Sequence, residues 1–313
     1  KIESFTYFKP TSLDLFNKNY ISLGGGKGWK VSTVKKKILF IAPLPPPITG
    51  QSLASLFLYN DIKDAFDITT INYTRKNAIA KSGMDFKFIS QVLKHGRKIK
   101  KYAKKSDAVY LTISQSLLGN LKDLYFIYKI GKKNRKKVII HLHGGYFDQY
   151  LKKTPFFVKF LNKILFKDIK SGVVLGESLI KCLTPILPKE KICIVNNFFD
   201  NDLLIDNDTF LKKWDSPKIT NLLFLSNLMI QKGYLDLLDG FILVPEDVRK
   251  NFVLNFAGDF ENSDNKNEFL DRIKNHQNIN YLGVIEKSSK KDILQKSHAL
   301  ILPTYYTFEG QPL

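Results

Sequence analysis

The sequence predicts an α/β protein with two successive domains, each built on a parallel β-sheet. Three observations support this fold class. The chain has 313 residues, about the length of two average domains. From position 37 onward, short apolar and β-branched runs alternate with segments of helical periodicity, as in βαβ units. A polar, acid-rich segment at 201–216 interrupts the alternation, and we place the linker between the domains there.

The first domain is expected at 37–200, behind a leader at 1–36 that we interpret as flexible. Runs of four to six apolar or β-branched residues between turn signals predict buried strands. These strands are expected at 37–42, 67–71, 108–112, 138–142, 172–175 and 192–195. The clearest helix is 86–105, whose apolar residues recur at spacings of three and four. Another helical segment, 53–59, follows the proline-rich loop after the first strand.

The second domain, expected at 217–313, repeats the pattern with fewer elements. Its strands are expected at 221–225, 252–257, 279–282 and 299–302, and its helices at 233–243, 265–274 and 290–296. Only a short loop follows the last strand, so we expect this domain to be truncated; a naturally short domain is the alternative. Ligands bind beyond the carboxyl ends of strands in such sheets. We expect these ends of the two domains to face a cleft.

The net charge of +20 is distributed unevenly along the chain. Residues 1–200 carry 36 basic and 13 acidic side chains, whereas residues 201–313 carry 13 basic and 16 acidic side chains. The first domain is therefore expected to meet an anionic partner, either a membrane surface or nucleic acid. The helix at 86–105 is basic and amphipathic, which is typical of helices that lie on membranes, although an inward-packing domain helix is the alternative. Nucleic acid is not expected, because basic and aromatic residues do not interleave as in a stacking platform.

Other classes of protein are excluded by what the sequence lacks. No apolar run approaches the roughly 18 residues of a membrane-spanning helix. Cys182 and Cys193 have no second Cys or His pair at metal-binding spacing, so neither a structural zinc site nor a disulfide framework is expected. A reducing, cytoplasmic location fits better. The Asp206-Asn207-Asp208 segment resembles a metal-binding Asp-x-Asp motif, but its place in the linker favours a helix cap or a solvated loop.

Two loops of the first domain carry residues suited to a polar ligand. The loop after the first strand ends at Gly50 and Gln51, where backbone N–H groups at a helix start can approach a diphosphate. An ordinary strand-to-helix turn is the alternative. His141 and His143 lie on one face at a strand tip, before two glycines, so His143 suits contact with a substrate. A structural histidine is the alternative there, and a metal pair is less favoured because no carboxylate lies at helpful spacing.

Two loops of the second domain are of interest as well. Lys232 lies between a buried strand and a helix start, where its ammonium can neutralise phosphate charge. A solvated surface lysine is the alternative. Glu309 follows the last strand in a loop with several free backbone N–H groups.

In this order and spacing, these segments resemble the GT-B-fold glycosyltransferases of family 4, a group that includes many bacterial O-antigen and capsule transferases. The GT-B fold consists of two Rossmann-like domains that face a cleft. The resemblance extends from about position 37 to position 313. It rests on the proline-rich loop to Gly50, His143-Gly144, Asn196-Asn197 with Asp200, Lys232-Gly233, 257–259, 281–284, Pro303 and 309–313.

The resemblance implies a retaining, metal-independent transfer of a sugar from a nucleoside diphosphate sugar to an acceptor. The donor would be bound mainly by the second domain and the acceptor by the first, with no cofactor besides the donor substrate. His143 near the transferred sugar, Lys232 at the leaving diphosphate and Glu309 at the donor sugar would be the catalytic residues. Donor binding would involve Gly50, Gln51, Asn227, Gly258, Val284, Gly310, Gln311 and Leu313.

Two departures from the family pattern stand out. Asn227 occupies a position where many members have Arg, so part of the charge compensation is missing or comes from elsewhere. The second glutamate of the family's pair would fall beyond Leu313. The implied acceptor is a lipid-linked saccharide used in surface polysaccharide synthesis, which suggests a peripheral location on the cytoplasmic face of a membrane. A sugar-nucleotide epimerase of the same architecture and a basic nucleic-acid-binding protein are the alternatives.

Overall fold

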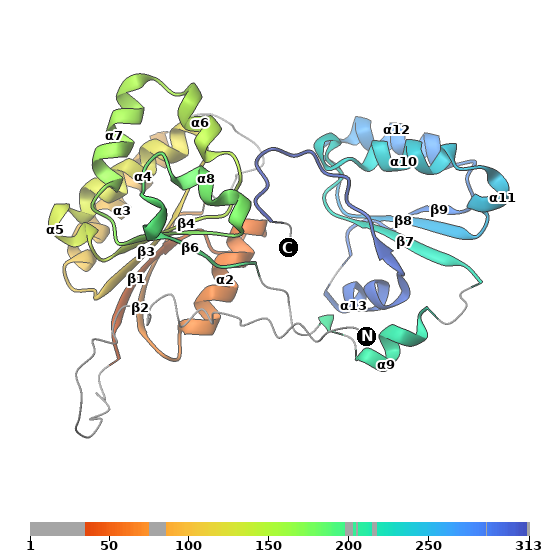
Figure 1. Ribbon diagram of the computed structural model, residues 1–313, viewed down its shortest axis with the longest axis horizontal. Coiled ribbons are helices and arrows are strands. Elements are labelled where there is room, and N and C mark those ends of the chain that lie inside the picture. Colours follow the sequence, from red (N-terminus) through yellow and green to blue (C-terminus); the bar gives the residue numbers. More distant parts are fainter. Residues whose placement is uncertain are drawn as a thin grey trace. The chain divides into compact units, whose positions relative to one another are not determined.

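A computed structural model of the chain describes residues 35–74, 86–197, 203–204, 206–214, 218–285 and 287–311 (Figure 1). It divides into two compact units, one formed by Lys1–Phe198 with Phe308–Leu313 and the other by Phe199–Thr307. The predicted domains differ from these units at the C-terminus, because the end of the predicted second domain packs on the first unit. Residues 1–34 of the predicted leader lie outside the described residues. No helix in the described part of the chain combines the length and the apolar character needed to cross a membrane.

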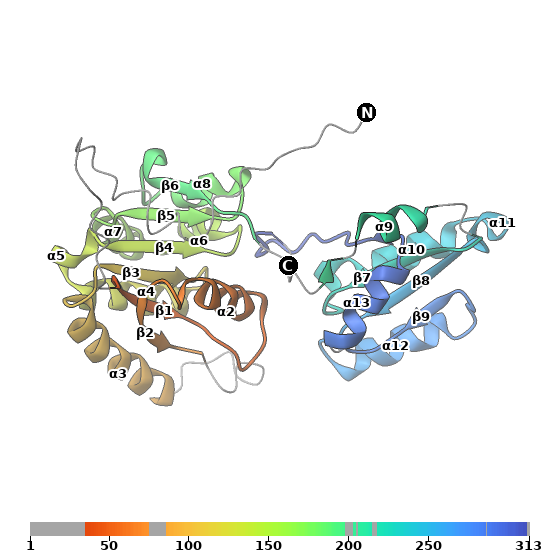
Figure 2. The same cartoon turned by 90° about the horizontal axis from the view of Figure 1, so that it is seen from below.

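The first unit contains a six-stranded sheet in the order β2-β1-β3-β4-β5-β6, which can be followed in Figure 2. All five strand pairings are parallel. The strands are β1 Lys37–Ala42, β2 Asp67–Asn72, β3 Ala108–Ile113, β4 Val138–Leu142, β5 Ser171–Val174 and β6 Ile192–Ile194. Each predicted strand of this unit is therefore confirmed to within one residue at either end. The agreement arises because central parallel strands are buried on both faces and so form continuous apolar runs.

Helices cover both faces of this sheet. They are α2 Gly50–Ile62, α3 Phe86–Ala103, α4 Leu117–Ile130, α5 Lys132–Arg135, α6 Phe147–Lys153, α7 Phe156–Phe166 and α8 Ile180–Leu183, with 3₁₀ turns at Glu177–Leu179 and Lys189–Lys191. Alternate strand residues point to opposite faces. Leu39 and Ile41 pack in the cluster that includes α3, α4, α6, α7 and α8, whereas Ile38 and Phe40 pack against Leu58 of α2. Figure 1 shows α3, α4 and α7 on one side of the sheet and α2 on the other.

Helix α3 is the helix that the sequence identified as basic and amphipathic. In its C-terminal half, Ile99 and Ala103 are fully buried, and Gly96 lies so close to Tyr125 of α4 that a Cβ would overlap the ring. In its N-terminal half, Phe86 and other apolar side chains are exposed. The inward-packing alternative therefore describes the second half of α3.

The second unit contains a four-stranded parallel sheet in the order β10-β7-β8-β9. Its strands are β7 Thr220–Leu225, β8 Phe252–Ala257, β9 Ile279–Tyr281 and β10 Ala299–Leu300, and its helices are α9 Asn207–Lys212, α10 Tyr234–Leu243, α11 Glu246–Arg249, α12 Ser263–Ile273 and α13 Lys287–Lys296, with a 3₁₀ turn at Ile230–Lys232. The sequence predicted all four strands, although β10 is two residues shorter than expected. The core on one face joins Phe224, Phe256 and Phe269 with Leu238 of α10.

The Asp-x-Asp segment of the linker region is a helix cap. Asp206 precedes α9, and its Oδ1 accepts a hydrogen bond of 2.8 Å from the backbone N–H of Thr209. Hydrogen bonds from the amide and hydroxyl of Thr209 stabilise the carboxylate and lower the pKa of Asp206. This confirms the interpretation of the segment as a cap.

Candidate functional site

The two sheet topologies locate the regions where a ligand can bind. In the first sheet the strand order reverses between β1 and β3, and in the second it reverses between β7 and β10. At such a switch point the loops that follow the two strands diverge and leave room for a ligand at the carboxyl ends. The loops concerned are 43–49 and 114–116 in the first unit, and 226–229 and 301–306 in the second.

At the switch point of the first sheet, helix α2 begins with a reciprocal cap. The backbone N–H of Ser52 donates a hydrogen bond to Oγ1 of Thr49 (3.1 Å), and the backbone N–H of Thr49 donates one to Oγ of Ser52 (2.8 Å). The amides of Gly50 and Gln51 have no hydrogen bond to any described residue, and the first turn of the helix carries no acidic side chain. The positive end of the helix dipole and these two amides would favour an anion, and the diphosphate contact expected at Gly50 and Gln51 stays a prediction.

His143 lies just beyond the carboxyl end of β4, close to His141. Their ring centroids are 3.9 Å apart, and the hydroxyl of Tyr110 lies 2.7 Å from Nδ1 of His141. The Nε2 atoms of both histidines are buried and have no hydrogen-bond partner among the described residues. Burial lowers the pKa of His143 to about 4, and burial together with the neighbouring His143 lowers the pKa of His141 well below its usual range. At neutral pH His143 is therefore an uncharged hydrogen-bonding group.

We expect the stability of the first unit to fall in acid because of His143. Its pKa of about 4 is below the value of 6.5 for an unperturbed histidine, so the unfolded chain binds this proton first as the pH falls. Between pH 7 and pH 4 the unfolding free energy should decrease by about 3 kcal/mol more in the wild type than in a His143→Gln variant. Urea denaturation at a series of pH values measures this difference. Parallel curves for the two proteins would contradict the assignment.

The chain's terminal segment packs against the turn that contains His143. A Cβ on Gly145 would lie 2.6 Å from the carbonyl oxygen of Glu309, and a Cβ on Gly310 would lie 2.5 Å from the carbonyl oxygen of His143. Both distances are too short for a Cβ atom, so the two backbone segments can lie this close only with glycine at positions 145 and 310. The structure thus brings together His143, Glu309 and Gly310, three of the predicted site residues.

Two polar side chains hold this segment in place. Gln115, in the loop after β3, accepts a hydrogen bond from the amide of Tyr146 (2.5 Å) and donates one to the carbonyl of Phe308 (3.2 Å). The backbone N–H of Asn197 donates a hydrogen bond to Oε1 of Gln311 (2.8 Å), and the side-chain Nδ2 of Asn197 donates one to the backbone carbonyl of Gln311 (2.7 Å). Gln115 was not among the predicted residues. Its position directly after a strand at a switch point is the signal that could have identified it.

A buried ion pair supports the loop of Gln115. Asp123 of α4 accepts a hydrogen bond from the amide of Ser114 (2.7 Å), and its other oxygen lies 2.9 Å from Nζ of Lys122. The Lys122 ammonium also lies over the ring of Tyr73, 3.4 Å from its centroid. Burial raises the pKa of Asp123, and the charge of Lys122 opposes this effect. Because a buried carboxylate needs such partners, the pair fixes the start of α4 and the loop before it.

In the second unit, Lys232 occupies the switch point between β7 and β10. Its side chain is buried, with only 9% of the residue exposed, and Nζ lies 5.2 Å from the centroid of the Tyr306 ring. The carbonyl of Gln231, next to Lys232, accepts hydrogen bonds from the amide of Tyr305 (3.0 Å) and the hydroxyl of Thr304 (3.3 Å). The segment after β10 thus packs directly on the turn that carries Lys232. The alternative of a solvated surface lysine is therefore wrong, because the side chain is buried in this contact.

Gly258 and Val284 follow the carboxyl ends of β8 and β9, at the same edge of the sheet. Gly258 has φ +144° and lies so close to the carbonyl of Ser226 that a Cβ would overlap it. The backbone amide of Gly258 donates a hydrogen bond to the carbonyl of Gly283 (2.9 Å). The carbonyl of Gly258 accepts one from the hydroxyl of Tyr281 (3.0 Å). Val284 is exposed.

The predicted site residues therefore gather at two sheet edges. His143, Glu309, Gly310, Gln311, Gly50 and Gln51 belong to the first unit, whereas Lys232, Asn227, Gly258 and Val284 belong to the second. Asn227 is exposed beyond the end of β7. Leu313 lies outside the described residues.

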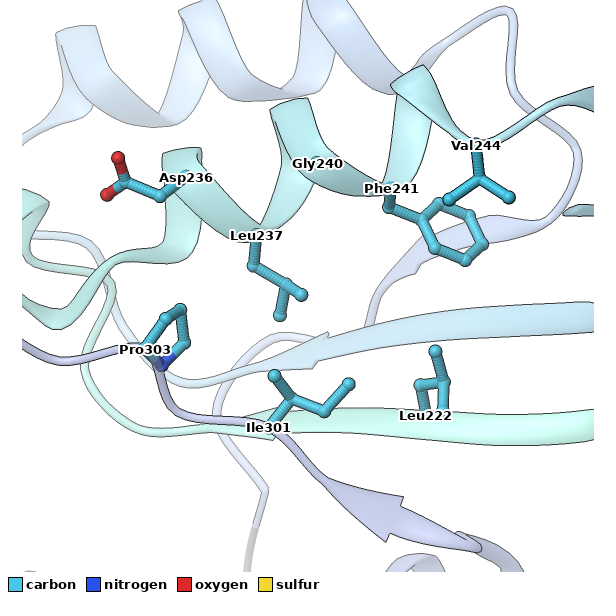
Figure 3. A pocket seen from close by; sticks show the side chains of 8 residues that line it. All are labelled: Leu222, Asp236, Leu237, Gly240, Phe241, Val244, Ile301 and Pro303. Atoms are coloured by element: carbon cyan, nitrogen blue, oxygen red, sulfur yellow. The ribbon is translucent and has the colours of Figure 1, made fainter.

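Of two surface hollows in the described part of the chain, the first borders the loop after β10, which contributes Ile301 and Pro303, and the second lies away from the switch-point loops. One, of about 350 Å³, lies between α10 and the strands β7 and β10, and Asp236 is its one charged lining residue (Figure 3). The other, of about 370 Å³, lies at the C-terminal ends of α3 and α4 and is lined mainly by lysines: Lys100, Lys104, Lys129, Lys132 and Lys133. The first lacks cations for a diphosphate, and the second lies at the opposite edge of its sheet from His143. Among the described residues, no three His, Cys, Asp or Glu side chains gather as a metal site.

Comparison with known proteins shows similarity in structure but not in sequence. No family model and no curated protein matches the chain. HepE from Anabaena, whose structure contains UDP and glucose, aligns with a TM-score of 0.55 and 13% identity over 86% of this chain and 74% of its own. An α,α-trehalose-phosphate synthase (UDP-forming) from Burkholderia vietnamiensis aligns with a TM-score of 0.58 and 10% identity, over 90% of this chain and 78% of its own. The lipopolysaccharide outer core galactosyltransferase WaaB aligns with a TM-score of 0.53 and 15% identity, over 86% of this chain and 74% of its own.

At 10–15% identity, this likeness in structure shows the fold alone. The likeness establishes the fold class that the sequence predicts. The chain has an α/β fold of the GT-B type, with one parallel sheet in each unit.

Proposed function

We propose that the protein is a retaining, metal-independent glycosyltransferase that moves a sugar from a nucleoside diphosphate sugar to an acceptor. The observation that carries this proposal is the buried Lys232 at the switch point of the second sheet. The solved structures of similar fold include HepE in complex with UDP-glucose, which supports a donor of this class.

The chemistry of the donor explains why a buried lysine matters. As the bond from the sugar C1 to the diphosphate oxygen breaks, negative charge develops on the diphosphate. A fixed cation in a site of low dielectric stabilises this charge more strongly than water does. Lys232 can supply the cation, with Tyr306 packed beside its ammonium. The loops at Gly258 and Val284 would hold the rest of the nucleotide at the same edge.

The first unit would provide the acceptor side of the reaction. His143 is uncharged near neutral pH, and its Nε2 has no hydrogen-bond partner in the part of the chain that the structure describes, so it can exchange a hydrogen bond with a sugar hydroxyl without binding tightly to anions. The terminal segment places the backbone of Glu309 and Gly310 against this histidine. The basic character of residues 1–200 supports a lipid-linked saccharide acceptor at the cytoplasmic face of a membrane.

A screen of nucleoside diphosphate sugars tests the proposed function. The correct donor should raise the melting temperature of the second unit, by an amount equivalent to about 2.7 kcal/mol at a concentration 100 times Kd. It should also release nucleoside diphosphate when an acceptor is added. If no donor in the screen stabilises the protein or is turned over, the proposal fails. Isomerised donor in the absence of acceptor would indicate an epimerase instead.

An arginine at position 227 should strengthen donor binding. Asn227 is exposed beyond β7, where a guanidinium could form paired hydrogen bonds to the diphosphate. We expect Asn227→Arg to lower the Kd for the donor about tenfold, which corresponds to about 1.4 kcal/mol. Isothermal titration calorimetry measures the change. The control Asn275→Arg adds the same charge at another exposed position of the unit and should leave Kd unchanged; equal effects would indicate a non-specific charge effect.

A further inference from the structure

The outer face of helix α7 exposes an unusual number of large apolar side chains. Phe156, Phe157 and Phe160 are 81%, 61% and 54% exposed, and Leu161 and Ile164 are exposed as well. At 100° per residue, these five residues occupy one continuous arc of the helix. Contiguous exposed apolar surface of this kind marks a site of interaction with a protein or a membrane.

The opposite face of α7 is firmly packed. Val158 and Phe166 are fully buried, and Asn162 exchanges two hydrogen bonds with Asn120 of α4, at 2.8 Å and 2.9 Å. The hydroxyl of Tyr150 in α6 also donates a hydrogen bond to Oδ1 of Asn120. The helix is therefore held in one orientation by a satisfied polar network, and its exposed apolar face is a property of the folded unit.

The charges around this face select its partner. Residues 149–167 contain five lysines and no acidic residue: Lys152, Lys153, Lys159, Lys163 and Lys167. On the helix, Lys159 and Lys163 lie four residues apart along one border of the apolar arc. A second copy of the chain packed on this face would bring two such sets of lysines together, which is unfavourable. An anionic lipid surface offers both an apolar interior for the phenylalanines and phosphates for the lysines.

Neighbouring helices of the first unit also expose large apolar side chains. Helix α4, on which α7 packs, exposes Leu117 and Leu121, and α3, on the other side of α4, exposes Phe86 and Leu93. Figure 1 shows these three helices on one side of the first sheet. Helix α6 begins directly after the turn that contains His143, and α7 follows it.

We propose that α7 is an interfacial helix that binds the first unit to an anionic lipid bilayer. Its phenylalanines enter the boundary between headgroups and acyl chains, and its lysines contact lipid phosphates. The proposal does not depend on the proposed function, because it rests on the exposure and charge of α7 alone.

Co-sedimentation with phosphatidylcholine vesicles, with and without phosphatidylglycerol, tests this proposal. The full chain should bind the anionic vesicles, and the variant F156S/F157S/F160S should bind them about 100-fold more weakly. The control F210S/L211S/L243S removes three exposed apolar side chains from the second unit and should bind like the wild type. Both variants change exposed residues, and equal melting temperatures would verify that they fold.

The lysines should contribute separately from the phenylalanines. The variant K159Q/K163Q should weaken binding to anionic vesicles about 30-fold, since each lysine near such a surface contributes about 1 kcal/mol. It should leave the weak binding to neutral vesicles unchanged. The control K218Q/K250Q removes two exposed lysines from the second unit and should have no effect.

Three results would overturn the proposal. Unchanged vesicle binding by F156S/F157S/F160S would exclude α7 as the contact. Loss of binding only in a variant of α3 and the residues after it, with Lys98, Lys100, Lys101, Lys104 and Lys105 neutralised, would assign the contact to that region. A wild-type dimer that the phenylalanine variant dissociates, without vesicle binding, would identify a second copy as the partner. Donor-induced stabilisation of the second unit should be the same in all these variants, which separates this proposal from the proposed function.

Discussion

Replacing Lys232 with methionine is expected to lower kcat/KM for sugar transfer about 1,000-fold, which corresponds to about 4 kcal/mol of transition-state stabilisation. Methionine keeps the apolar stem that packs beneath Tyr306 but removes the ammonium. The leaving diphosphate then gains negative charge in a buried site without its cation. Because the charge is greatest in the transition state, most of the loss should appear in kcat and a smaller part in the Kd for the donor.

The structural contribution of Lys232 must be measured separately, since its side chain is buried. The melting temperature of the Lys232→Met variant without donor reports this contribution, and we expect little change. Lys232→Arg keeps the positive charge and should retain part of the activity. The control Lys250→Met alters an exposed lysine of the same unit and should be fully active. A Lys232→Met variant with wild-type kcat would remove the main support for the proposed function.

The central strands of the first sheet could be predicted from the sequence because they are buried on both faces, and β8 of the second sheet has no exposed residue. The segments that became β1, β4 and β8 were predicted with the bounds that the structure has. Such a strand is a continuous run of apolar or β-branched residues, and this local signal does not depend on the rest of the fold. The sequence could also place His143 and Lys232 in loops that follow strands, where parallel sheets bind ligands: His143 directly follows β4, and Lys232 ends the 3₁₀ turn between β7 and α10. Their roles at such a site stay predictions.

The remaining features depend on contacts between distant segments. Gln115 reaches the carbonyl of Phe308, which is 193 positions away, and nothing near either residue in the sequence indicates this contact. For the same reason the terminal segment was assigned to the second domain, although it packs on the first unit. Helical periodicity shows that Phe156 and Phe160 share a face of α7, but it cannot show that this face is exposed and that the face of Asn162 is buried.

The second expected result concerns Gly233, which connects the turn of Lys232 to helix α10. Gly233 has φ +77°, in the left-handed region, and lies so close to the carbonyl of Pro303 that a Cβ would overlap the oxygen. An alanine there requires about 1–2 kcal/mol for the backbone conformation and about 1–3 kcal/mol for the overlap. We expect Gly233→Ala to lower the unfolding free energy of the second unit by about 4 kcal/mol, measured by urea denaturation.

Gly240 provides a matched control for this prediction. It lies within α10, seven residues further along, and a Cβ there would meet no heavy atom within 4 Å. Alanine is favoured over glycine inside a helix, so Gly240→Ala should raise the unfolding free energy by about 0.5–1 kcal/mol. The same substitution should therefore have opposite signs at the two positions. If Gly233→Ala were as stable as the wild type, the close packing of the Pro303 segment on the Lys232 turn would be wrong, and with it the placement of Tyr306 beside the ammonium.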